Sequence, residues 1–193
     1  MTHVCQYWRE SIVSTPANWT TISGSRRLAA ASLERAKGAL LEIHLDMHAI
    51  RDDPQFLDSL APHLQNAETL DVTGILSADD IFLFSQHPMI NLRSLSLSDE
   101  IVDDWERTID PFESLPNTLQ YLLLFGVPFY PSLLNIRTLT GLELLDHKCK
   151  LHLDTLLDFL EENRSLTRAG LRITFIEPSL RSSRRRAPIG NRL

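Results

Sequence analysis

Leu92-Arg93-Ser94-Leu95-Ser96-Leu97 is the stretch that decides the fold, because its L-x-x-L-x-L frame returns along the chain. The frame is complete at residues 92, 119 and 139, has isoleucine at the fourth position in the copy that begins at residue 40, and is only partly kept in the copies that begin at residues 67 and 166. The intervals between successive copies are 27, 25, 27, 20 and 27 residues. All but one of these intervals indicate a repeating unit of 25 to 27 residues.

The frame fits a short β-strand, in which side chains alternate between two faces. The fourth and sixth positions then point the same way, and their leucines can stack from unit to unit into a core that no single unit could form. This pattern resembles the leucine-rich-repeat family, whose units combine a short strand with a helix or an irregular segment. The resemblance implies an α/β fold, a leucine-rich-repeat solenoid of about six units over residues 25–176, preceded by one or two N-terminal helices.

The family usually places Asn or Cys three residues after the last leucine of the frame. The corresponding residues here are His48, Ile75, Glu100, Val127, His147 and Thr174. Without a ladder of asparagines, the solenoid is expected to be irregular.

The amino-acid composition restricts the class of protein. The 193 residues are 43% hydrophobic and 23% charged, which favours one globular unit with one core. The net charge is -6, and residues 177–193 carry five arginines and one glutamate, so residues 1–176 carry -10. This negative charge on residues 1–176 argues against nonspecific nucleic-acid binding over a broad surface. Residues 177–193 are expected to be a basic disordered tail, either simply solvated or a nuclear-import or nucleic-acid patch.

Cys5 and Cys149 are too few for a disulfide framework, and no apolar segment resembles a signal peptide or a membrane span. We therefore expect a cytoplasmic or nuclear protein that does not engage a membrane.

The N-terminal segment has a helical pattern over residues 3–14, with Val4, Trp8 and Ile12 at four-residue steps on one face. Pro16 disfavours helical geometry at Thr15, so the helix is expected to end near Ser14.

The set Val4-Cys5-x-x-Trp8-Arg9 and Pro16-x-x-Trp19-x-x-Ile22 resembles the second half of an F-box, as found ahead of leucine-rich repeats in fungal F-box proteins. The resemblance covers residues 1–24 and implies contact with the adaptor subunit of a cullin-RING ubiquitin ligase. Its contact residues would be Val4, Trp8, Ile12 and Trp19. The first half of an F-box, a Leu-Pro-rich segment and a helix, would lie before Met1, so we expect either a truncated product or lost adaptor binding. Trp8 and Trp19 could instead be core aromatics that cap the first unit.

Further helices are expected over residues 25–37, 54–65, 77–88 and 153–160. Gly38 would end the first of them in the left-handed conformation. The connection after Leu124 is short and contains Pro128 and Pro131, so we expect it to be extended.

No motif supplies the convergent groups that an enzyme needs, and no glycine loop indicates a cofactor. His147, Cys149 and His152 match no strong zinc signature. The carboxylates of residues 99–104 lack the glycine of a calcium loop, so a solvated acidic loop is expected. We therefore predict no catalysis, no cofactor and no metal.

The third and fifth frame positions should line the concave strand surface, where a target protein would bind. The predicted partner-binding residues are His44, Asp71, Ser96, Tyr121, Leu123, Phe125, Glu143 and Arg168. Tyr121, Leu123 and Phe125 would form an apolar anchor, unless residues 99–118 fold over them. The resemblance implies a substrate-recognition subunit, or a fragment of one, and the alternative is a repeat scaffold without a ligase.

Overall fold

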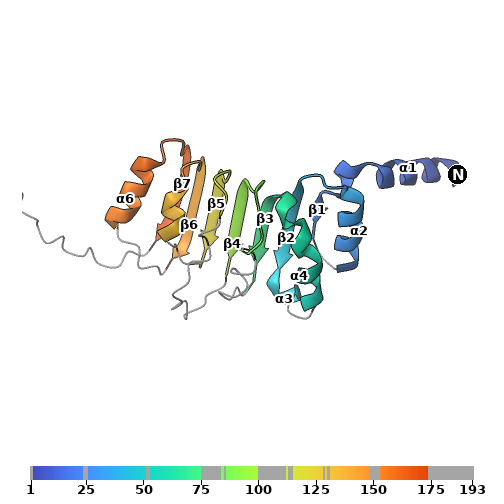
Figure 1. Ribbon diagram of the computed structural model, residues 1–193, viewed down its shortest axis with the longest axis horizontal. Helices are drawn as coiled ribbons and strands as arrows, with labels where there is room; N and C mark the ends of the chain where they lie inside the picture. Colours follow the sequence, from blue (N-terminus) through green and yellow to red (C-terminus); the bar gives the residue numbers. More distant parts are fainter. Residues whose placement is uncertain are drawn as a thin grey trace, which may run out of the picture.

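The described residues fold as an α/β structure around a parallel sheet, which confirms the predicted α/β class (Figure 1). The computed structural model describes residues 2–23, 26–50, 53–74, 84, 86–99, 112, 115–127, 129, 131–147 and 153–173. Most of the predicted helix over residues 77–88, most of the acidic loop, the His147, Cys149 and His152 side chains and the basic tail lie outside the described part.

In the described part of the chain, seven strands form the sheet, in the same order as in the sequence, and every neighbouring pair is parallel. They are β1 (Thr21–Ile22), β2 (Leu41–Asp46), β3 (Ala67–Thr73), β4 (Ser94–Ser98), β5 (Tyr121–Phe125), β6 (Gly141–His147) and β7 (Arg168–Ile173). Each strand therefore pairs with the strands immediately before and after it in the sequence.

The register of the sheet aligns the frames with one another. The fourth frame positions form one row across β2 to β7, made of Ile43, Leu70, Leu95, Leu122, Leu142 and Ala169. The sixth positions form a second row, made of Leu45, Val72, Leu97, Leu124, Leu144 and Leu171. All of these side chains except the two on β7 are buried, so the two rows are the centre of the core.

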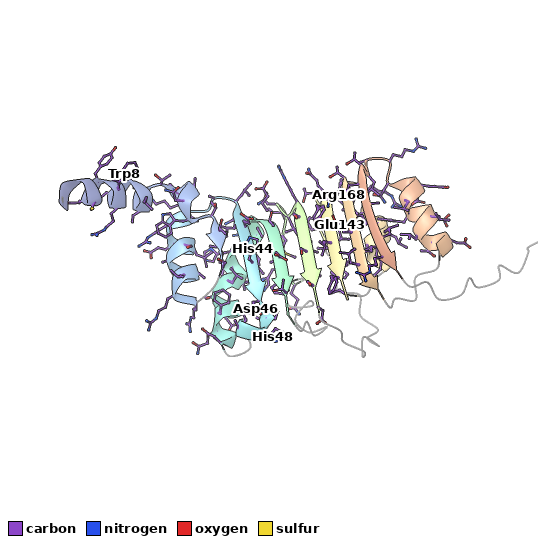
Figure 2. All side chains as sticks on the ribbon, turned by 180° about the vertical axis from the view of Figure 1, so that it is seen from behind. Trp8, His44, Asp46, His48, Glu143 and Arg168 are labelled. Carbon is purple, nitrogen blue, oxygen red and sulfur yellow. The ribbon has the colours of Figure 1, made fainter. Side chains whose placement is uncertain are left out.

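Helical segments lie before β1 and between later strands. They are α1 (Thr2–Ser14), η1 (Pro16–Trp19), α2 (Arg26–Ala36), α3 (Met47–Ile50), α4 (Pro54–Leu60), η2 (Ala61–Asn66), η3 (Pro131–Asn135) and α6 (Leu153–Glu162). Helices α3 and α4 lie on one side of the sheet, and α6 lies at its β7 end (Figure 1). The side opposite α3 and α4 is an open face (Figure 2). Helix α2 lies beside β1 at the first edge of the sheet.

Two predicted boundaries of the helices are confirmed. Helix α1 ends at Ser14, two residues before Pro16, as the proline requires. Helix α2 ends at Ala36, and Gly38 follows it with a positive φ of 78°.

Other predictions need correction. The expected helix over residues 54–65 is α4 followed by η2, because Pro62 has no amide hydrogen for the helical hydrogen bond. The connection expected to be extended contains η3, whose Leu133 is buried in the core.

The first and last units also differ in detail from the prediction. A bulge in β3 pairs Leu41 with Ala67, so the buried Leu41 takes the first frame position and Leu40 is exposed. In α6, Leu156 and Phe159 are buried, whereas Leu157 of the predicted stripe is 47% exposed.

The two faces of β5 provide a test of the core. We expect Leu122→Ala to lower the free energy of unfolding by about 2–5 kcal/mol, because the truncated side chain leaves a cavity in a fully buried row. The neighbouring Leu123 points to the open face and is half-buried, so Leu123→Ala should cost clearly less. Urea unfolding of the two variants measures both values, and equal losses would contradict the assignment of faces.

Candidate functional site

Helix α1 carries large apolar side chains that the rest of the described chain does not cover. Tyr7 is 68% exposed and Trp8 61%, and Ile12 and Val13 are also exposed. The helix extends away from the body of the protein (Figure 1), and Trp8 stands far from the sheet (Figure 2). The predicted contact residues Trp8 and Ile12 are therefore free to meet a partner, while the Val4 side chain lies outside the described part.

Trp19, the fourth predicted adaptor contact, is instead engaged within the chain. Its indole Nε1 donates a hydrogen bond of 2.9 Å to the carbonyl oxygen of Ile12. The guanidinium carbon of Arg35 lies 4.3 Å from the centre of its ring, in a cation–π contact. Trp19 is half-buried against the core, so it joins the C-terminal end of α1 to α2.

The isolation of α1 has an energetic consequence. A helix of 13 residues is marginal in water when it has no packing partner, because nucleation is costly and few hydrogen bonds repay it. Residues Cys5–Glu10 are all exposed, so burial within this chain contributes little to the stability of this helix. A partner that covers Tyr7, Trp8 and Ile12 would stabilise the helix and gain their apolar area.

The open face of the sheet carries the predicted partner-binding residues. The strand register places the third frame positions in one row and the fifth in another. His44, Asp71, Ser96, Leu123 and Glu143 lie side by side in the fifth-position row. Tyr121 and Arg168 belong to the third-position row, and Phe125 lies beside Ser98 and Leu145 at the next position of the same face.

The two ends of this face differ in chemistry, and His44 and Glu143 mark them in Figure 2. On the β2 side, the His44 ring lies between two carboxylates. Its Nε2 is 3.1 Å from Glu42 Oε1, and its Nδ1 is 3.3 Å from Asp71 Oδ2. The first end of the open face is therefore acidic.

At the other end, Tyr121, Glu143 and Arg168 form a connected set across three strands. Arg168 Nη2 lies 2.6 Å from Glu143 Oε1, as an ion pair without the alignment of a hydrogen bond. The Glu143 side chain is 15% exposed and that of Arg168 is 71% exposed, so the arginine presents its charge to solvent. A Cβ atom at Gly141 would lie 2.6 Å from the Tyr121 ring, so only glycine there lets the ring lie against the sheet.

The pKa of Tyr121 is raised above its ordinary value of 10.0. The largest cause is burial, followed by the hydrogen bond that the hydroxyl donates to Glu143 and by the negative charge of Glu143, while Arg168 acts in the opposite direction. The neutral hydroxyl is therefore held as a hydrogen-bond donor to Glu143.

The predicted apolar anchor lies where the sequence places it, with Tyr121, Leu123 and Phe125 all half-buried on the open face. Of the segment predicted to fold over this anchor, Phe112 and Leu115 pack on the core, and residues 100–111 lie outside the described part. The described residues therefore leave both predictions open, that the anchor is exposed for binding and that residues 99–118 cover it.

A cleft at the β2 end has no counterpart in the sequence analysis. Its volume is about 620 Å³. Among the described residues, it is lined by Ser23, Arg26, His44, Leu45, Asp46, Ala49, Ile50, Asp53, Phe56, Asp71 and Thr73. These residues come from β1, β2, β3 and three helices or their flanks, and only the three-dimensional fold brings them together.

Comparisons with known proteins add no family assignment. The chain matches no family model, and no curated protein matches it. In the part of the chain that the structure describes, no helix is long and apolar enough to cross a bilayer. Within the same residues, no three His, Cys, Asp or Glu side chains are grouped as ligands for a metal ion.

The Tyr121 contact predicts a change in titration. Glu143→Gln removes the carboxylate charge and weakens the acceptor, so the pKa of Tyr121 should fall toward its ordinary value. Alkaline titration by tyrosinate absorbance measures this, with the curve of Tyr121→Phe subtracted to isolate one of the three tyrosines. An unchanged Tyr121 curve in Glu143→Gln would contradict the contact.

The raised pKa of Tyr121 makes the free energy of unfolding depend on pH. The folded chain holds the Tyr121 proton more tightly than the unfolded chain, so this stabilisation is fully present below pH about 10 and is lost as pH rises through the raised pKa. Tyr121→Phe should therefore lose less stability above pH about 10 than the wild type does.

Proposed function

We propose that this chain is a substrate-recognition subunit, or a fragment of one, of a cullin-RING F-box ubiquitin ligase. The observation that carries the proposal is the exposed aromatic surface of α1, with Tyr7 and Trp8 projecting from a helix that extends away from the body. Residues 1–24, which contain this helix, are the segment whose sequence resembles the second half of an F-box.

A second part of the proposal is that the sheet is an irregular leucine-rich-repeat solenoid. Its support is the register, which brings equivalent frame positions of successive units into contact from β2 to β7. Further support comes from the core, in which the two leucine rows run continuously through the units.

In this proposal the two surfaces have separate tasks. Helix α1 binds the adaptor subunit through Trp8 and Ile12, and the open face binds a target protein through the residues between His44 and Arg168. The chain catalyses nothing, because ubiquitin transfer belongs to other subunits of the ligase. It would act in the cytoplasm or the nucleus, where such ligases work.

The alternative is a repeat scaffold that binds a protein partner without any ligase. The observation in its favour is that the open face is formed entirely by β2 to β7 and needs nothing from α1. The contact between Tyr121, Glu143 and Arg168 would then serve partner binding alone.

Adaptor binding separates the two proposals. We expect the purified chain to capture the adaptor subunit, and we expect Trp8→Ala to weaken the complex by about 30-fold or more, as is typical of a buried aromatic hot spot. Leu28→Ala is the matched control, because Leu28 is also a large exposed apolar residue, at 65%, but lies on α2. Titration calorimetry of the three proteins measures the affinities.

Two outcomes would count against the ligase proposal. Failure of the folded wild-type chain to bind the adaptor would leave the scaffold proposal. An equal loss of affinity in Trp8→Ala and Leu28→Ala would show that binding does not use the exposed surface of α1.

A further inference from the structure

The cleft of about 620 Å³ lies at the first edge of the sheet. Strand β1 pairs with β2 only at Glu42 and Ile43, so no strand among the described residues lies beside His44–Asp46 on that side. Ser23, directly after β1, and Arg26, at the start of α2, line one part of the cleft. The early end of β1 is therefore what leaves this space open.

The base of the cleft is apolar. Leu45, Ile50 and Phe56 are buried core residues that also line the cleft, and Ala49 lies beside them. An aliphatic or aromatic portion of a ligand would lose water contact against these side chains, which favours binding.

The rim of the cleft is acidic. It carries three aspartates, Asp46, Asp53 and Asp71, against a single guanidinium, that of Arg26. Arg26 already has partners, since its Nη1 lies 3.6 Å from Asp53 Oδ1 and donates a 2.7 Å hydrogen bond to Gln55 Oε1. Asp46 Oδ1 accepts only the backbone amide of His48, at 3.0 Å, so within the described residues its charge has no cationic partner.

We propose that this cleft binds an arginine side chain of an extended segment in the target protein. Arginine fits both parts of the cleft, because its methylene stem can pack on the apolar base while its planar guanidinium meets carboxylates at the rim. Two carboxylates receive it. Asp46 is the last residue of β2, and Asp71 lies on the neighbouring strand β3 beside His44, two positions before the residue that pairs with Asp46. This inference rests on the proposed function, since it names the class of target segment that the open face selects.

The test uses the full chain labelled with ¹⁵N and two synthetic peptides of the same sequence, one with a central arginine flanked by alanines and the other with citrulline in its place. Citrulline has nearly the same shape as arginine but no charge. We expect the arginine peptide to shift the amide resonances of His44, Asp46 and Thr73 in a saturable manner, and we expect the citrulline peptide to bind much more weakly.

Variants localise the binding. The double variant Asp46→Asn/Asp71→Asn should bind the arginine peptide about tenfold more weakly, since both charged acceptors are lost. The variant Asp158→Asn/Glu161→Gln removes two exposed charges from α6 and should bind as the wild type does. This matched control separates a specific site from general attraction to an acidic chain.

Several results would overturn the proposal. These are equal binding of the citrulline peptide, equal losses in the two double variants, or shifts spread over the whole surface. Spermidine that binds the cleft as tightly as the peptide would identify a site for small polyamines instead of a peptide site. Adaptor binding depends on Trp8 and not on these aspartates, so the ligase proposal and the cleft proposal fail in distinguishable experiments.

Discussion

The stacking of apolar side chains from strand to strand is the interaction on which the rest of the structure depends. No single unit buries its own leucines. Leu95 and Leu97 of β4, for example, are covered because Leu70 and Val72 precede them and Leu122 and Leu124 follow them. Among the described residues the rows end at β7, where Leu171 is exposed at a position that is buried on every earlier strand from β2 onward. The residues at the third and fifth frame positions do not join the rows and lie on the open face.

This constraint explains how much of the fold the sequence predicts. The six frames identify β2 to β7 and the face to which each residue belongs, because alternation in a strand is strict. Strand β1 escapes detection because two residues, Thr21 and Ile22, are too short to show alternation. The sequence also does not predict the bulge in β3. Leu40 and Leu41 are both leucines, so the pattern alone allows either of them to pair with Ala67.

The candidate site is predictable only where it follows the frame. The positions of His44, Tyr121 and Glu143 on one face come directly from their spacing. The contacts of Trp19 with Ile12 and Arg35 cannot be predicted from the spacing. A helical pattern with two tryptophans fits an adaptor contact and an internal contact equally well. The cleft is also beyond sequence reasoning, since Arg26, Asp53 and Asp71 belong to separate segments that meet only in the folded chain.

In the proposed function, α1 is a partner-binding helix and not part of the folded body. Hydrogen exchange of the full chain, alone and with the adaptor subunit, tests it most directly. The account predicts that residues 2–14 exchange rapidly in the free chain and become protected in the complex, while the strands β2 to β6 are protected in both. Protection of residues 2–14 in the free monomer, or no gain in protection with saturating adaptor, would contradict it.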